Sequence, residues 1–151
     1  MQIVDFEPRH ADAWRTLNEA WLTKYFVVEA KDREILDNPG PVILDKGGHI
    51  FMAELDGQTV GCVSLIPMED GGFEVGKMAV HESAQGRGIA RRLMELCIDK
   101  ARALGAPRLY LESSSHLTPA LTLYRSVGFV HLPPSPTPYA RADVWMEMRL
   151  T

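Results

Sequence analysis

The chain has 151 residues, which is the size of one domain with one hydrophobic core, and we expect residues 1–151 to form a single domain. Hydrophobic residues make up 46% and charged residues 24% of the chain, a composition that excludes disorder along its whole length. The formal net charge of −4 disfavours nonspecific binding to nucleic acid, and no apolar run approaches the roughly 18 residues of a membrane span.

The two cysteines, Cys62 and Cys97, both lie in apolar stretches. Two cysteines provide neither the spacing of a zinc site nor a disulfide framework, so we predict two buried thiols and no metal. The first ten residues also lack the basic and apolar regions of a secretory signal. We therefore expect a cytoplasmic protein with neither nucleic acid nor a membrane as a partner.

The first half of the chain predicts a strand, two helices and a three-stranded meander. Apolar side chains recur with a helical period after the first strand, and Asn38-Pro39-Gly40 ends the second helix. The Asp56-Gly57 pair lies between two runs of strand-forming residues, which is a strong hairpin signal. The expected elements are strand 2–6, helix 11–25, helix 30–36 and strands 49–55, 59–66 and 73–80.

The second half predicts a long amphipathic helix and two strand–helix–strand units. Gly105 and Pro107 end the long helix, and Thr118-Pro119 opens the next one. Four prolines between 133 and 138 predict a stiff, extended surface loop. The expected elements are helix 88–104, strand 108–112, helix 118–127 and strands 129–132 and 143–150. The order βααβββαβαββ predicts an α/β domain with a mixed sheet.

A glycine-bearing turn joins the fourth strand to the long helix. Gly86 and Gly88 allow backbone amides to approach a phosphate, and the first turn of a helix provides free N–H donors. The turn lacks the Gly-Lys-Ser/Thr ending of a P-loop. It also lacks the glycine spacing and the early position of a dinucleotide fingerprint.

The turn, Gln85-Gly86-Arg87-Gly88-Ile89-Ala90, resembles the coenzyme A pyrophosphate loop of the GCN5-related N-acetyltransferases (GNAT). A second segment, residues 120–129, resembles the Ala-x-x-Leu-Tyr-x-x-x-Gly-Phe pattern of the same family, and the element order matches over nearly the whole chain. The resemblance implies a GNAT fold and acetyl-CoA as co-substrate. It assigns the cofactor to Met78, Ala79, Val80, Gln85, Gly86, Arg87, Gly88, Ile89 and Ala90.

The resemblance also implies two catalytic residues. Tyr124 matches the tyrosine that protonates the leaving thiolate, and Glu74 resembles the strand-four glutamate that serves as the general base in one branch of the family. Strict alternation along the fourth strand predicts that Glu74 and Met78 share a face, with Lys77 on the opposite face in a structural or solvent-facing role. Leu117 stands where many members carry an asparagine that binds pantetheine, and a nearby serine is expected to replace it.

The acceptor is expected to be a small-molecule or small-peptide amine. Fold position alone assigns Tyr25, Phe26 and Tyr139 to the acceptor side, with Trp21 and Arg141 nearby. The main alternative function is a non-catalytic acyl-CoA-binding regulatory or interaction module. A longer acyl group, a water wire in place of Glu74 and a homodimer also stay open.

Overall fold

The computed structural model describes all 151 residues and contains one seven-stranded sheet. The strand order is β1-β2-β3-β4-β5-β7-β6, and every neighbouring pair is antiparallel except the parallel pair β4–β5. The strands are β1 Gln2–Asp5, β2 His49–Leu55, β3 Gln58–Pro67, β4 Phe73–Val80, β5 Arg108–Ser113, β6 Val130–Leu132 and β7 Val144–Arg149. The mixed sheet predicted from the sequence is thus confirmed.

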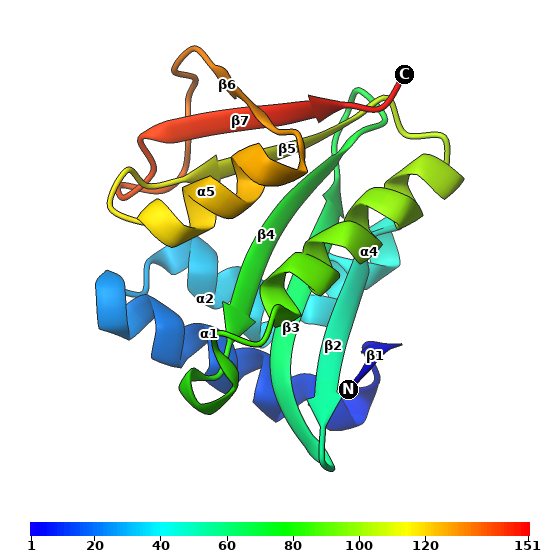
Figure 1. Ribbon diagram of the computed structural model, residues 1–151, viewed down its shortest axis with the longest axis vertical. Coiled ribbons are helices and arrows are strands. Elements are labelled where there is room, and N and C mark those ends of the chain that lie inside the picture. The colour runs from blue at the N-terminus through cyan, green and yellow to red at the C-terminus, as the bar shows by residue number, and fades with distance from the viewer.

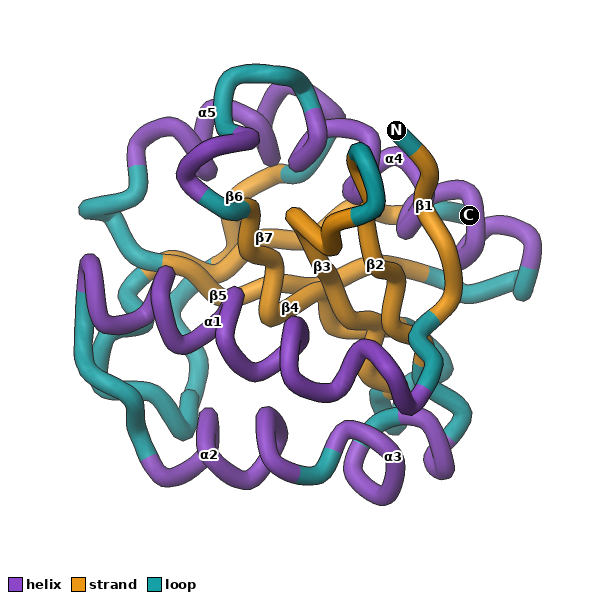
Figure 2. Tube along the Cα trace, turned by 90° about the horizontal axis from the view of Figure 1, so that it is seen from below, coloured by secondary structure: helices purple, strands orange, loops and turns teal.

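Helices cover both faces of the sheet, as Figures 1 and 2 show. One face carries α4 and α5, and the other carries α1, α2 and α3. The helices are α1 Ala11–Tyr25, α2 Ala30–Asp37, α3 Pro39–Val42, α4 Ile89–Ala103 and α5 Thr118–Val127, with short 3-10 turns at Pro8–His10, Leu44–Lys46 and Glu82–Ala84. The sequence interpretation missed α3, because Asn38-Pro39-Gly40 ends α2 but also places a proline at the start of a new turn.

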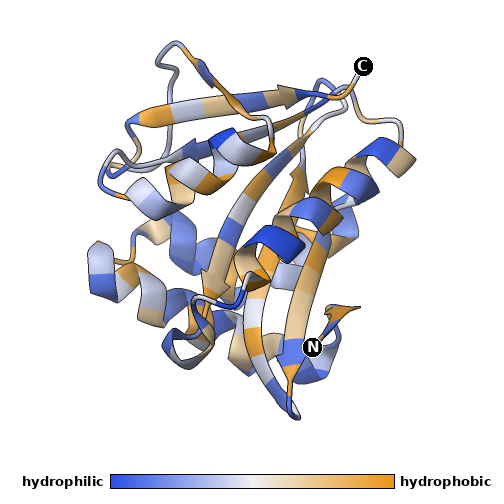
Figure 3. Cartoon of the chain, viewed as in Figure 1, coloured by the Kyte–Doolittle hydropathy of each residue, from blue (hydrophilic) through white to orange (hydrophobic).

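Two hydrophobic clusters follow from this layering. The larger one lies between the sheet and α4, whose apolar face recurs at Ile89, Leu93 and Cys97. The smaller one joins α1 and α2 to the opposite face and includes Trp14 and Ala79. Figure 3 shows hydrophobic colour along β2 and β3 and strongly hydrophilic stretches on α4. No helix is long and apolar enough to cross a bilayer.

The backbone conformations at the β2–β3 hairpin and at the end of α5 agree with those that their turn residues predict. Asp56 and Gly57 both adopt positive φ between β2 and β3, as the Asp-Gly signal predicts. Gly128 adopts a left-handed φ of 116° at the end of α5. Helix α5 begins at Thr118 as predicted, but its N-cap is Leu117, and Thr118 is the first helical residue rather than the cap that Thr118-Pro119 suggested. Residues 133–138 form neither helix nor strand, in agreement with the four prolines.

Candidate active site

Strand β4 contains a bulge that governs the geometry of the site. The β3–β4 register runs Ser64↔Gly76 and then Cys62↔Ala79, so β4 carries an extra residue at this point. Lys77 lies in the bulge with φ of 53°, in the left-handed region. Pairing between β4 and β5 stops at Glu74↔Tyr110. The two parallel strands therefore separate beyond Glu74 and leave an opening in the middle of the sheet.

The bulge reverses the side-chain alternation along β4. Before it, Val75 packs into the cluster under α4; after it, Ala79 packs into the cluster under α1 and α2. Met78 packs on the α4 side, so Glu74 and Met78 do not share a face. Lys77 points toward α2, on the same side of the sheet as Glu74, so the predicted opposite face was wrong. Its side chain is only 8% exposed, which contradicts the solvent-facing alternative, whereas its ion pair with Asp32 agrees with the structural one. Strict alternation cannot anticipate an inserted residue.

A cavity of about 400 Å³ occupies this opening and is lined from both faces of the sheet. The β4 and β5 residues of the lining include Glu74, Met78 and Glu112. The α1–α2 side contributes Trp21, Phe26 and Ile35, and the last loop contributes Pro138, Tyr139 and Arg141. Leu117 and Tyr124 line the cavity from the side of α5. Residues far apart in the sequence thus meet at the point where β4 and β5 separate.

Glu74 is a carboxyl group without any hydrogen-bond or ion-pair partner in the chain, and it lines this cavity. Burial, reinforced by the negative charge of Glu112, raises the pKa of Glu74 to about 7. Lys77 and Lys31 act in the opposite direction but do not cancel this effect. A carboxyl group with a pKa near neutrality can accept a proton and release it again under ordinary conditions.

Glu112 lies on β5, next to Glu74 in the same cavity. Tyr110 donates a hydrogen bond of 2.8 Å to Glu112 Oε2, and Thr137 donates to Oε1. The proline-rich segment is therefore more than a surface loop, because it fixes a carboxylate of the cavity. The sequence interpretation missed Glu112, although polar Tyr110 and Glu112 alternate with buried Leu109 and Leu111 along β5.

Tyr124 approaches the cavity from α5, on the opposite side of the sheet from Glu74. Its ring packs edge-on against Phe129, with centroids 6.0 Å apart. Burial raises the pKa of the hydroxyl to about 12, so the phenol is protonated at neutral pH. Burial is the only influence on this pKa, and no hydrogen-bond partner within the chain acts on the hydroxyl. The structure thus offers a proton acceptor and a proton donor from opposite faces of one cavity.

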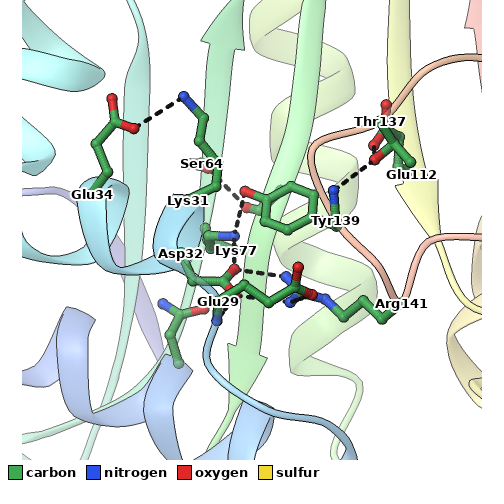
Figure 4. A network of polar contacts seen from close by, with 12 residues as sticks. Glu29, Lys31, Asp32, Glu34, Ser64, Lys77, Glu112, Thr137, Tyr139 and Arg141 are labelled. Atoms are coloured by element: carbon green, nitrogen blue, oxygen red, sulfur yellow. Dashed lines mark hydrogen bonds and ion pairs between the residues drawn. The ribbon is translucent and has the colours of Figure 1, made fainter.

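Four ion-paired residues and one tyrosine form a polar network at the α2 end of the cavity, and Figure 4 shows them at close range. We call Glu29, Asp32, Lys77, Tyr139 and Arg141 the Asp32 cluster. Asp32 is fully buried; it accepts from Lys77 Nζ at 2.7 Å and from Arg141 Nη1 and Nη2 at 2.8 and 2.6 Å. Burial opposes the charged carboxylate, but these hydrogen bonds outweigh it and lower the pKa of Asp32 to about 2.

The Asp32 cluster connects three separate parts of the chain. Lys77 belongs to the β4 bulge, Asp32 and Glu29 to the start of α2, and Arg141 to the last loop. Lys77 and Arg141 both stack on the ring of Tyr139, with cation–centroid distances of 4.6 and 4.4 Å. Asp32 gave no functional signal in the sequence, because an acidic residue in the first helical turn is also typical of a capping box.

The glycine turn has the geometry predicted for a phosphate site. Gly86 and Gly88 have φ of 79° and 77°, and a Cβ at either position would point into open space. The backbone N–H groups of residues 86–91 donate to no acceptor within the chain. Gly88 is the N-cap of α4, a helix of 15 residues, so the partial positive charge of the helix terminus lies at this turn.

The other predicted site residues are the cofactor residues at the end of β4 and the acceptor residues, and only some of each line the cavity. Met78 lines the cavity, whereas Ala79 is buried under α1, and the Val80 carbonyl accepts a hydrogen bond of 3.2 Å from Gln85. Of the predicted acceptor residues, Phe26 and Tyr139 line the cavity, but Tyr25 does not. Tyr25 is 47% exposed and packs against Trp21 and Phe26 outside the lining.

Ser113 and Ser114 line the cavity beside Leu117, where the predicted pantetheine contact lies. Ser114 is buried and its hydroxyl accepts from the His116 N–H, whereas the Ser113 hydroxyl has no partner in the chain. Cys62 and Cys97 are fully buried, as predicted. Burial raises the pKa of the Cys62 thiol to about 12, which keeps it protonated and unreactive.

Comparison with known proteins identifies the family. Residues 8–129 match the sequence profile of the acetyltransferase (GNAT) family. The chain is similar to the uncharacterized N-acetyltransferase YjgM of Escherichia coli (31% identity over 94 residues, 60% of this chain and 56% of the relative). It is also similar to an IAA acetyltransferase of Azospirillum brasilense (39% over 80 residues, 52% of each chain). The chain thus matches little more than half the length of these relatives.

Solved structures show the same fold at low sequence identity. A GNAT acetyltransferase from Staphylococcus aureus has a TM-score of 0.89 at 18% identity, covering 99% of both chains. The putative acetyltransferase yncA of Salmonella typhimurium, solved with acetyl-CoA, has a TM-score of 0.80 at 22% identity, covering 100% of this chain and 94% of that one. On the match to its sequence profile and on this shared architecture, the chain belongs to the GNAT acetyltransferase family.

Proposed function

We propose that the protein transfers the acetyl group of acetyl-CoA to a primary amine by direct attack within a ternary complex. The observation that carries the proposal is the cavity between β4 and β5, which presents Glu74 from one face of the sheet and Tyr124 from the other. An acyl transfer to an amine needs one group that removes a proton from nitrogen and one that donates to the leaving sulfur.

The glycine turn and the opening beside it fit coenzyme A. The free N–H groups of residues 86–91 suit a pyrophosphate, and the separation of β4 from β5 leaves room for the pantetheine arm. Met78 lies between these two regions, so we assign its backbone N–H to the oxyanion that develops on the thioester carbonyl. The Ser113 hydroxyl is our candidate for the polar contact that asparagine makes in many family members.

The chain's own groups support a complete proton balance. As the C–N bond forms, the amine proton passes to Glu74, whose raised pKa allows it to act as a base near neutral pH. As the C–S bond breaks, the sulfur takes the bond's electron pair and a proton from Tyr124. The same burial that raises the pKa of Tyr124 also disfavours a free thiolate. Solvent then restores the proton to Tyr124 and removes it from Glu74.

The Asp32 cluster supports a small acceptor. The contacts of Arg141 with Glu29 and Asp32, together with the 3.0 Å hydrogen bond from Ala140 N to Glu29, tie the last loop to α2 at the acceptor end of the cavity. We propose that this tie narrows the acceptor end of the cavity and disfavours a folded protein surface as the acceptor. The carboxyl groups of Glu74 and Glu112 form no ion pair, so the inner cavity favours an acceptor that brings positive charge.

The direct test follows free thiol release from acetyl-CoA in the presence of a panel of small primary amines and short peptides. We expect thiol and N-acetyl product to appear in equal amounts with small amines and much more slowly with peptides. Cofactor binding measured in parallel separates the alternatives. Binding of acetyl-CoA without product from any amine would favour a regulatory or interaction module, and absence of both would reject acyltransfer.

A further inference from the structure

Lys77 adopts a conformation that its residue type disfavours. Only two non-glycine residues in the chain have positive φ, and the other, Asp56, lies in a two-residue hairpin turn where that conformation is expected. A lysine has no such local reason, because its Cβ meets the neighbouring carbonyl in the left-handed region. Backbone strain of this kind persists only where surrounding contacts fix it, and it concentrates at functional sites.

Three separate contacts fix the bulge. The Ser64 hydroxyl donates to the Gly76 carbonyl at 2.9 Å, and the Cys62 thiol lies 3.5 Å from the Lys77 carbonyl. These two contacts satisfy carbonyl groups that lose their ladder partners where the register shifts. The third contact is the ion pair of Lys77 Nζ with Asp32 Oδ1, which Figure 4 shows at the centre of the Asp32 cluster.

The ion pair itself is a poor source of stability. Both side chains are removed from water, and a buried pair of this kind is often no more stable than apolar residues of the same size. Burial works to lower the pKa of Lys77, and Asp32 opposes that effect. The presence of the Lys77–Asp32 pair is therefore better explained by the geometry that it imposes. It attaches the strained backbone of Lys77 to the first turn of α2.

We propose that Lys77, held by Asp32, is a positioning residue that fixes the β4 bulge and thereby the alignment of Met78 N–H and Glu74 for transfer. The proposal rests on the acyltransfer function given above. Lys77 is the bulged residue, and Met78 follows it directly. Arg141 binds the same carboxylate, so the wall of the acceptor cavity and the bulge share one anchor.

Single substitutions do not separate positioning from folding. Lys77→Met leaves Arg141 as the only cationic partner of Asp32, and Asp32→Asn leaves the buried Lys77 ammonium without an anionic partner, so both single variants should lose stability. The double variant Lys77→Met/Asp32→Asn removes one charge of each sign and keeps Arg141 paired with Glu29. It should regain most of the lost stability, so its properties report on positioning of the bulge and not on folding.

The backbone conformation of the bulge can be measured first, independently of any assay of activity. We would measure backbone Cα and Cβ chemical shifts of residues 76–78 by NMR in the wild type and in the double variant. Left-handed shifts at residue 77 in the wild type, lost or averaged in a folded double variant, are the expected result. Retention of the left-handed shifts in the double variant would overturn the proposal, and this outcome does not depend on whether the protein is a transferase.

Kinetics then test the alignment. We expect the double variant to lose about 100-fold in kcat, as for a small misplacement of reacting groups, while the Kd for CoA stays within about threefold because the glycine turn is unchanged.

The groups facing Glu74 are Lys77 on β4, Lys31 on α2, Glu112 and Tyr110 on β5, and Tyr139 on the last loop. Removal of the Lys77 charge should move the acidic limb of kcat to higher pH.

Lys31→Met provides the matched control, because it removes the other cation that acts on Glu74 and leaves the bulge intact. It should also move the acidic limb upward but keep most of kcat. A double variant that folds normally and retains wild-type kcat would contradict the proposal. If the wild type itself releases no thiol with any amine, the proposed function fails, and the NMR comparison still decides whether Lys77 holds the bulge.

Discussion

Glu74 and Glu112 line one cavity from neighbouring parallel strands, and neither carboxyl group has a cationic partner within ion-pair distance. Their separate surroundings give them different roles. Glu112 accepts hydrogen bonds from Tyr110 and Thr137, which fix the position of its carboxylate. Glu74 has no donor, and burial together with the charge of Glu112 raises its pKa to about 7.

Neutralising Glu112 should therefore lower the pKa of Glu74. In Glu112→Gln, the repulsion that disfavours a charged Glu74 is lost, so Glu74 deprotonates at lower pH. The acidic limb of the kcat–pH profile should move to lower pH. The amide that Glu112→Gln introduces keeps an oxygen acceptor for one of the two hydroxyls, Tyr110 or Thr137, and its NH2 group can donate to the other. A profile that stays in place, or moves upward, would show that Glu112 does not act on the base.

Removal of the Glu74 carboxylate should affect chemistry far more than binding. We expect Glu74→Gln to lower kcat on the order of 100-fold or more, the usual contribution of a general base, with little change in the Kd for CoA. The acidic limb that belongs to Glu74, expected near pH 7, should disappear from the profile. Glu69→Gln, at an exposed turn position of the same meander, is the matched control and should behave as the wild type.

The Tyr124 hydroxyl should contribute to catalysis and hardly at all to folding. No hydrogen-bond partner in the chain acts on it, so Tyr124→Phe should change the free energy of unfolding by less than about 0.5 kcal/mol in a urea titration. Loss of the proton donor should lower kcat by on the order of 100-fold. Tyr25→Phe, outside the cavity lining, controls for the loss of a hydroxyl. Full activity of Tyr124→Phe would assign the proton donor elsewhere.

Arg141→Met should weaken both the fold and acceptor selection. The change leaves Glu29 and Asp32 with fewer partners in a buried setting, and we expect a loss of about 3 kcal/mol in the free energy of unfolding. Arg33→Met removes a cation with ion pairs on the exposed side of α2, and it should cost less than about 1 kcal/mol. The Arg141 variant should also accept peptides better relative to small amines. Unchanged peptide discrimination would show that the Asp32 cluster does not restrict the acceptor.

Much of the fold could be read from the sequence because its signals are local. The helical period of α1, the Asp-Gly hairpin and the glycine turn before α4 each depend on a few neighbouring residues, and the structure confirms all three. The boundaries of α5 were also correct, although its N-cap was not. Turn chemistry and periodicity are local properties, which is why they carry over to the folded chain.

The site was harder to predict because it depends on one inserted residue and on distant partners. The bulge at Lys77 reverses the alternation of β4, and no sequence pattern announces a lysine with positive φ. The contact of Asp32 with Lys77 spans 45 positions, and that with Arg141 spans 109. Glu112 became significant only through its position beside Glu74. The catalytic roles, the cytoplasmic location and the oligomeric state stay predictions.

The most direct measurement is a calorimetric titration of the wild type, Gly88→Glu and Gly105→Glu with acetyl-CoA. Gly88 and Gly105 lie at opposite ends of α4 with φ of 77° and 74°, and a Cβ at either would meet no neighbour, so both variants carry similar backbone strain. Only Gly88→Glu places a negative charge where the pyrophosphate is expected. We predict that the wild type and Gly105→Glu bind acetyl-CoA and that Gly88→Glu does not. Equal binding by both variants, or no binding by the folded wild type, would contradict the account.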